Sequence, residues 1–135
     1  MHKILSLMLA VMLCGTAAAQ EAQSTKLAES LKVIYYEFPD HFTTNLRSGN
    51  KLVQATIAID TQYEEAVIYR VIKHRLAIDN EIIMLLTNMT EADARNPAAK
   101  AKLQDDIRDV VNAVLQSKYQ FGGIEHAYIT SLTIQ

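Results

Sequence analysis

Apolar residues recur every three or four positions along residues 64–90, the longest stretch with a helical repeat. Such spacing gives a helix one continuous apolar side. That side consists of Val67, Ile68, Val71, Ile78, Ile82, Leu85, Leu86 and Met89, with Arg70, Lys73, Asn80, Glu81 and Thr87 opposite. The pattern predicts an amphipathic scaffold helix over a hydrophobic core, and Asp60 or Thr61 is expected to cap its start.

Two charged residues interrupt this apolar side. Arg75 lies near its middle and Asp79 one turn later, the spacing of an i, i+4 ion pair. Either the helix bends near residues 75–77 and turns both side chains outward, or the pair is partly buried. We favour the bend, because burying two charges requires several kcal/mol of desolvation per ion.

A second helix is predicted over residues 97–118. Asn96 followed by Pro97 is a typical helix start, since Asn caps the first turn and Pro fits its first position. The apolar face of this helix is formed by Leu103, Ile107, Val110, Val111 and Val114. We therefore expect two long helices in succession.

Alternating apolar and polar residues predict the strands. Residues 42–46 and 53–59 alternate on either side of a turn at 47–50 and form an antiparallel hairpin, in which Gly49 tolerates a positive φ. Residues 33–38 end at Pro39 and predict a short edge strand. A last strand is expected over 124–134. Its shared face is predicted to hold Ile124, Tyr128, Leu132 and Ile134.

These elements predict an α+β fold. It is a two-layer sandwich in which an antiparallel sheet carries two long consecutive helices on one face, in the pattern β-β-α-α-β. With 135 residues, 50% of them hydrophobic, the chain fits one small domain. A net charge of −2, with basic residues scattered among acids, argues against a nucleic-acid partner.

The first nineteen residues are typical of an export signal. A short basic start precedes an apolar core, and an A-x-A pattern ends at Ala19 before Gln20, the expected cleavage point. The alternative is an uncleaved N-terminal membrane anchor. Residues 20–32 predict a linker and residues 33–135 a periplasmic domain. The single cysteine, Cys14, lies in the segment to be removed, so no disulfide is expected.

Candidate chemistry is sparse. His41, His74 and His126 lack a second ligand at metal spacing, and the acidic residues fall at helix starts or on a polar helix face. We therefore predict no catalytic residues, no metal and no cofactor. The aromatic residues Tyr35, Tyr36 and Phe38 on the edge strand either pack at the rim of the core or form a partner surface.

Four segments, in order, resemble the FliL family of flagellar basal-body-associated proteins. They are H-F-T-T-N-L (41–46) with L-V-Q-A-T-I-A-I (52–59), K-H-R-L-A-I-D-N-E-I-I-M-L-L (73–86), N-P-A-A-K-A-K-L-Q-D-D-I (96–107) and Y-I-T-S-L-T-I-Q (128–135). The sequence departs from the family at Leu76, where proline is usual, and at Asp79, where a basic residue is usual. Family members also typically carry a permanent membrane helix, which the cleavable-looking signal replaces here.

The resemblance implies an SPFH/stomatin-like periplasmic domain that associates with the flagellar motor around its stator units. It also implies support of motility or swarming, assembly into a homo-oligomeric ring, and no catalysis. Two rival hypotheses remain: a soluble periplasmic ligand-binding or small hydrolytic domain, and a membrane-anchored scaffold. An apolar pocket with converging polar groups favours the first rival, and a mature N-terminus at Met1 favours the second.

Overall fold

In the computed structural model, strand β3 (Leu52–Thr61) is the centre of a four-stranded antiparallel sheet. It pairs with β4 (His126–Ile134) on one side and, on the other, with β1 (Ile34–Glu37) and β2 (Phe42–Asn45). The predicted β2–β3 hairpin is confirmed, and Gly49 in its loop has a φ of +94°. The predicted inward face of β3 is also confirmed, because Val53, Ala55, Ile57 and Ile59 are fully buried.

The structure describes residues 23, 32–47 and 49–135. The hydrophobic core lies between Phe38 and Ile129, inside a compact unit formed by Val33–Gln135. The predicted signal at 1–19, with its cleavage point at Ala19 and Gln20, lies outside the described residues, as does nearly all of the predicted linker at 20–32.

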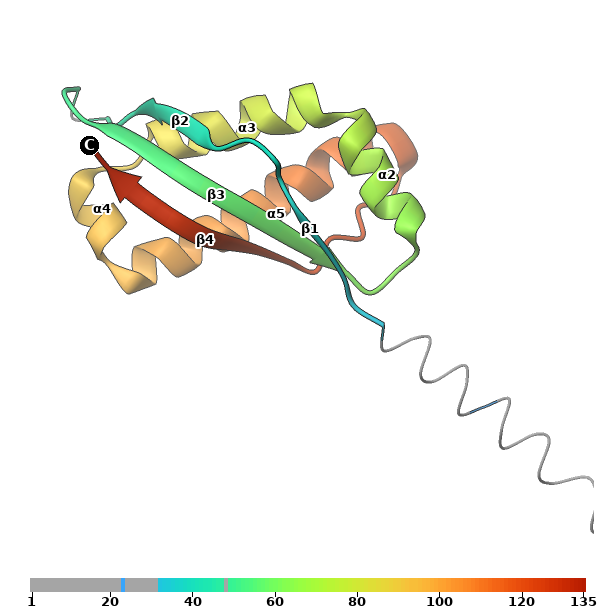
Figure 1. Cartoon of the computed structure of the whole chain (residues 1–135). Helices are drawn as coiled ribbons and strands as arrows, with labels where there is room; N and C mark the ends of the chain where they lie inside the picture. Colours follow the sequence, from blue (N-terminus) through green and yellow to red (C-terminus); the bar gives the residue numbers. More distant parts are fainter. Residues whose placement is uncertain (1–22, 24–31, 48) are drawn as a thin grey trace, which may run out of the picture. The chain divides into compact units, whose positions relative to one another are not determined.

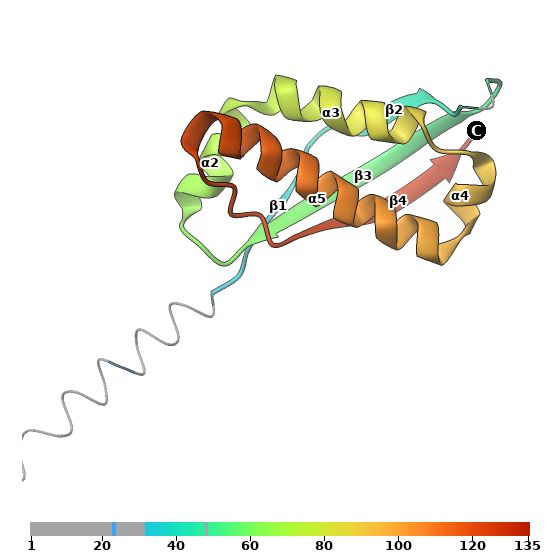
Figure 2. The ribbon, with the colours of Figure 1, turned by 180° about the vertical axis from the view of Figure 1, so that it is seen from behind.

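The helices cover one face of the sheet. Helices α3 (Arg75–Thr87) and α5 (Pro97–Tyr119) lie across it, α2 (Glu65–Lys73) lies at one end, and the short α4 (Glu91–Arg95) connects α3 to α5 (Figures 1 and 2). Ile78 and Ile82 from α3 meet Ile107 and Val111 from α5 in the core, and all four are fully buried. In the described part of the chain the opposite face of the sheet carries no helix, as the two views together show.

The element order is β-β-β-α-α-α-α-β. The three strands before the helices agree with the predicted edge strand and hairpin, which the pattern β-β-α-α-β counted as two. The predicted long helix is two helices separated at His74, and the short α4 is an additional helix. His74 has φ −108° and ψ 23°, outside the helical region, and its imidazole Nε2 lies 2.8 Å from the Tyr119 hydroxyl at the end of α5. This contact with α5 stabilises the junction where neither Pro nor Gly is present.

The Arg75–Asp79 pair is partly buried, as the second alternative states: the two groups lie 3.2 Å apart with side chains only 23% and 26% exposed. The helix does break, at His74, just before the expected residues 75–77, but the break does not turn the two side chains outward. Asp40 supplies a second carboxylate at 3.0 Å from the guanidinium, and the ring of Phe38 lies beneath it. The ion pair is therefore half-buried and rests on the core.

The expected cap at Asp60 or Thr61 is wrong. The N-cap of α2 is Glu64, without a side-chain capping bond, because β3 continues through both residues. The Thr61 hydroxyl instead donates to the Gly123 carbonyl at 2.6 Å and accepts from the Tyr63 N–H at 3.1 Å. The cap at Asn96 is confirmed, since its Oδ1 accepts from the Ala98 N–H at 2.9 Å.

The predicted face of the last strand is wrong for Tyr128. Ile129 pairs with Ile57, but the next pair is Ser131 with Thr56, so Thr130 is an extra residue in a β-bulge. The extra residue reverses which side chains face the core. Ala127 and Ile129 point inward before the bulge, whereas Tyr128 lies on the outer face; Ile124 is buried but precedes the strand.

Candidate functional site: a buried aspartate and an uncharged helix face

The outer face of the sheet holds a buried carboxylate. Asp60, the residue before the last of β3, has only 4% of its side chain exposed and accepts a hydrogen bond from the His126 backbone N–H at 2.8 Å. The Tyr128 hydroxyl donates to Oδ2 at 2.7 Å, and the His126 ring Nδ1 lies 3.1 Å from Oδ1. Tyr35, opposite Asp60 on β1, lies beside Tyr128 with the ring centroids 6.4 Å apart and the rings tilted by 43°. Three strands thus converge on this group.

The Asp60 cluster has the properties of a structural anion. Hydrogen bonds to a carboxylate favour its charged form, and burial is tolerated when such donors are present. Donating to Asp60, together with partial burial, raises the pKa of Tyr128 from 10.0 to about 12. Donors within the chain therefore already engage both Asp60 oxygens. The cluster joins the end of β3 to the start of β4.

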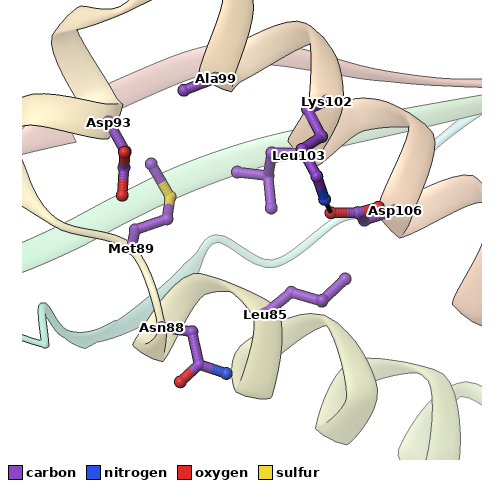
Figure 3. Close-up of a pocket in the computed structure, with 8 residues that line it drawn as sticks. All are labelled: Leu85, Asn88, Met89, Asp93, Ala99, Lys102, Leu103 and Asp106. Atoms are coloured by element: carbon purple, nitrogen blue, oxygen red, sulfur yellow. Dashed lines mark hydrogen bonds and ion pairs between the residues drawn. The ribbon is translucent and has the colours of Figure 1, made fainter.

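One open pocket lies where α3, α4 and α5 meet (Figure 3). Its volume is about 220 Å³, and it is lined by Leu85, Asn88, Met89, Asp93, Ala99, Lys102, Leu103 and Asp106. Its polar groups already have partners within the chain. Lys102 pairs with Asp106 at 2.6 Å, and Asp93 accepts the Thr90 N–H at 2.9 Å in a capping box. The pocket therefore lacks the free converging polar groups that orient a small ligand.

A second open pocket of about 240 Å³ lies beside α2. Tyr63 and Phe121 form part of its wall in an edge-to-face pair with centroids 4.9 Å apart. Neither pocket includes Asp60, His126 or Tyr128. Within the described ranges, no group of three or more His, Cys, Asp or Glu side chains is placed to hold a metal ion. The polar groups of the pocket between α3, α4 and α5 are thus engaged within the chain, and the pocket beside α2 is lined by both Glu64 and Arg70.

The predicted aromatic surface on β1 separates into three environments. Tyr35 is 67% exposed, Tyr36 is half-buried against the core, and Phe38 is 1% exposed. Phe38 packs edge-to-face on both Tyr36 and Phe42, with centroids 5.3 and 5.4 Å apart. Phe38 therefore belongs to the core, and its prediction as part of a partner surface is wrong. Tyr35 alone of the three points fully outward, and its role as a partner contact stays a prediction.

A larger exposed apolar surface lies on α2 and α3. Leu76, at the start of α3, is 88% exposed, and Met84, two turns later, is 56% exposed. Tyr69 and Ile72 on α2 and Ile83 on α3 are also exposed. We call the exposed residues of α3 the α3 outer face; they are Leu76, Ala77, Asn80, Ile83, Met84 and Thr87. None of the six is charged, while the charged residues of α3, Arg75, Asp79 and Glu81, are half-buried at its sides.

Helix α5 provides a comparison within the same molecule. It packs on the same sheet as α3, but its exposed positions include Lys102, Asp105, Asp109 and Lys118. A charged outer face is usual for a solvated helix, whereas depletion of charge with exposed Leu, Ile and Met is typical of the core of a protein interface. The contrast between the two helices makes the α3 outer face a candidate contact surface.

The described residues thus form a small α+β domain with an antiparallel sheet, one layer of helices and an exposed apolar helix face. Among them, no helix is both long and apolar enough to cross a membrane. The family model described as "Flagellar basal body-associated protein FliL" matches residues 35–135, and the chain belongs to this family. The resemblance inferred from the sequence is confirmed.

A curated relative agrees with this assignment. The "Flagellar protein FliL" of Aquifex aeolicus (strain VF5) is 25% identical over 114 residues, which cover 84% of this chain and 68% of the relative.

Sequence reasoning missed the Asp60 cluster and the α3 outer face. The cluster joins residues from three strands, and nothing in the sequence near Tyr128 indicates the bulge that determines its orientation. The α3 outer face had a visible signal, because Leu76, Ile83 and Met84 occupy the side assigned to polar residues. Examining both sides of the predicted helix, and not only the more apolar side, would have identified the α3 outer face.

Proposed function

We propose that this protein is a non-enzymatic, periplasmic module of the flagellar basal body. It associates with motor proteins around the stator and supports motility or swarming. The observation that carries the proposal is the exposed apolar surface of α2 and α3, with Leu76 88% exposed, on a domain whose described pockets are open. Large apolar side chains exposed on neighbouring helices are a feature found at protein–protein contacts.

Membership of the FliL family supports the flagellar assignment. The export pattern at 1–19 supports a periplasmic location, and the two-layer arrangement is compatible with an SPFH/stomatin-like domain. As part of the proposal, copies of the chain gather at the motor as a homo-oligomeric ring.

The first test is deletion of the gene. Swarming, and swimming in a viscous medium, are expected to be impaired, while export of flagellin continues. Unchanged motility under load contradicts the proposal.

The second test examines whether the exposed surface of α2 makes the functional contact. Ile72→Asp adds a charge to an exposed position of α2 and is expected to reduce swarming without lowering the amount of protein. Ala113→Asp is the matched control, because Ala113 is exposed on α5, whose outer face already carries charges. Equal swarming of the two variants contradicts the assignment of the contact to α2.

The third test determines the processing. Mass spectrometry of the protein isolated from cells is expected to give an N-terminus at Gln20. An N-terminus at Met1 identifies the membrane-anchored scaffold instead. In-cell crosslinking from Tyr35 and Tyr69 to motor components then identifies the partners.

A further inference from the structure

The pocket beside α2 has an apolar floor with a charge of each sign next to it. Its volume is about 240 Å³, and it is lined by Tyr63, Glu64, Ala66, Val67, Arg70 and Phe121. Val67 is only 3% exposed and forms the floor. Glu64 precedes Val67 by three residues and Arg70 follows it by three, so both side chains neighbour Val67 on the helix surface. The pocket therefore presents a carboxylate and a guanidinium at its rim.

The aromatic wall of this pocket is held in place by the buried Thr61. Its hydroxyl donates to the Gly123 carbonyl at 2.6 Å and accepts from the Tyr63 N–H at 3.1 Å, so one side chain fixes both segments that carry the aromatic residues. The Phe121 ring lies against Gly123, where a Cβ would meet it at 2.8 Å. Tyr63 and Phe121 are 50% and 40% exposed, yet they form an edge-to-face pair. The wall is therefore preformed.

The two charged groups at the rim are available to an occupant. Glu64 is the N-cap of α2 but makes no side-chain capping bond. The guanidinium carbon of Arg70 lies 4.6 Å from the centre of the Tyr119 ring, a contact that leaves the N–H groups of the guanidinium unused. Neither side chain forms an ion pair with the residues that the structure describes. In the pocket between α3, α4 and α5, by contrast, Lys102 and Asp106 pair with each other.

We propose that the pocket beside α2 binds a free α-amino acid with an apolar side chain, in its zwitterionic form. The carboxylate of the amino acid pairs with Arg70, because a guanidinium matches a carboxylate with two parallel hydrogen bonds. Its ammonium pairs with Glu64. Its side chain lies on Val67 against Tyr63 and Phe121, whose rings favour an edge-to-face or offset arrangement with an aromatic neighbour.

Charge and size favour this class of ligand. A cation alone is repelled by Arg70 and an anion alone by Glu64, whereas a zwitterion satisfies both groups. The Cα atoms of Glu64 and Arg70 are about 9 Å apart along the helix axis, a separation that two hydrogen bonds and the short span from an ammonium to a carboxylate can fill. A volume of about 240 Å³ lies below the range of about 300–1,000 Å³ typical of drug-sized ligands, so the pocket suits a smaller molecule.

The pocket lies on a different side of α2 from the exposed apolar residues of that helix. Tyr69 and Ile72 are two and five residues after Val67, which places them about 160° and 140° around the helix from it. A partner that covers Tyr69 and Ile72 therefore leaves the pocket open. The inference goes beyond the proposed function and does not depend on it.

Titration with L-phenylalanine, followed by NMR of the purified ¹⁵N-labelled protein, tests the site. Up to about 10 mM, the range for weak binding, saturable shifts are expected for the amide signals of Val67, Phe121 and Gly123. The signals of Lys102 and Leu103 in the other pocket are expected to stay unchanged. The absence of saturable shifts, or shifts centred away from the pocket beside α2, overturns the inference.

Two analogues of the ligand test the charge pairs. N-acetyl-L-phenylalanine lacks the ammonium, and L-phenylalaninamide lacks the carboxylate. Each is expected to bind at least about fivefold more weakly than L-phenylalanine, because a charge-assisted hydrogen bond is lost. Equal binding of all three compounds overturns the inference.

Two variants assign these charges to residues. Glu64→Gln is expected to remove the preference for L-phenylalanine over its N-acetyl form, and Arg70→Gln the preference over the amide. Arg95→Gln is the control, because Arg95 pairs with Glu91 on α4, outside the pocket, and it is expected to keep both preferences. Since Arg70 also packs on Tyr119, the result for Glu64→Gln decides if Arg70→Gln unfolds.

Persistence of the preference over the N-acetyl form in Glu64→Gln overturns the inference. All of these measurements use the purified protein and the ligand alone. They leave the motility phenotype of the gene deletion, and hence the proposed function, to stand or fall separately.

Discussion

Asp60 and His126 face each other at the start of the β3–β4 ladder, and the His126 backbone N–H donates to the buried Asp60 carboxylate at 2.8 Å. A side chain thus replaces part of the strand pairing at this point. The Glu125 N–H donates to the Asp60 carbonyl at 3.0 Å, so Asp60 engages β4 through both its main chain and its side chain. The stability of this end of the sheet therefore depends on the charge and the donors around Asp60.

Tyr128→Phe is expected to lower the free energy of unfolding at pH 7 by about 1–2 kcal/mol, because a hydrogen bond to a charged acceptor is lost. Its pH dependence has a definite sign. In the folded protein the pKa of Tyr128 is raised from 10.0 to about 12. The contribution of its hydroxyl to the free energy of unfolding is therefore complete below pH 10 and is lost as the pH rises toward 12. Urea denaturation, with tyrosine absorbance at 295 nm followed up to pH 12, measures both effects.

Tyr35→Phe is the control, since no hydrogen bond of its hydroxyl to the described residues is present and it is 67% exposed. It is expected to leave the stability unchanged. If the highest-pH phase of tyrosine ionisation persists in Tyr128→Phe, the assignment of this phase to Tyr128 is wrong.

The neighbouring residues Ile82 and Ile83 test the orientation of α3. Ile82→Ala is expected to lower the free energy of unfolding by about 2–5 kcal/mol, because a fully buried side chain leaves a cavity. Ile83→Ala is expected to lower it by clearly less, about 1 kcal/mol, since Ile83 is 36% exposed and lies about 100° around the helix from Ile82. Denaturant unfolding at a concentration where the protein is monomeric gives both values, and similar losses for the two variants contradict the orientation.

Alanine substitutions at Gly123 and Gly49 distinguish the effect of steric contact from that of backbone strain. Both have positive φ, 96° and 94°, which disfavours any other residue. A Cβ at Gly123 meets the Phe121 ring at 2.8 Å and Val67 at 3.2 Å, whereas a Cβ at Gly49 meets nothing within 4 Å. Gly49→Ala is expected to lower the free energy of unfolding by the backbone strain alone, about 1–2 kcal/mol, and Gly123→Ala is expected to lower it by clearly more; thermal unfolding of the two variants gives the order. The reverse order contradicts this account.

Asn96 tests the start of α5. Its Oδ1 caps the Ala98 N–H at 2.9 Å, ahead of Pro97 at the first helical position. Asn96→Ala is expected to lower the free energy of unfolding by about 1 kcal/mol, and Asn96→Asp to preserve it, because Asp is an equally good cap. Calorimetry of the two variants measures the difference, and equal destabilisation by both is the result that excludes a capping role.

Local patterns in the sequence determined the helices, the hairpin, the inward face of β3 and the start of α5. These features depend on periodicity and on caps within a few residues, and Asn96 with Pro97 is the clearest case. The family also followed from the order of four segments, and it is confirmed. The predicted N-terminal export signal is likewise a local pattern and stays a prediction.

Only the tertiary structure decided the rest. At the break, His74 contacts Tyr119, which is 45 positions later in the chain, and the side of the sheet that Tyr128 occupies depends on one extra residue at Thr130. Asp60 is buried on an outer face because β4 brings donors to it from 66 and 68 positions away. Periodicity records how side chains alternate within one element, whereas burial and hydrogen bonding depend on which elements meet.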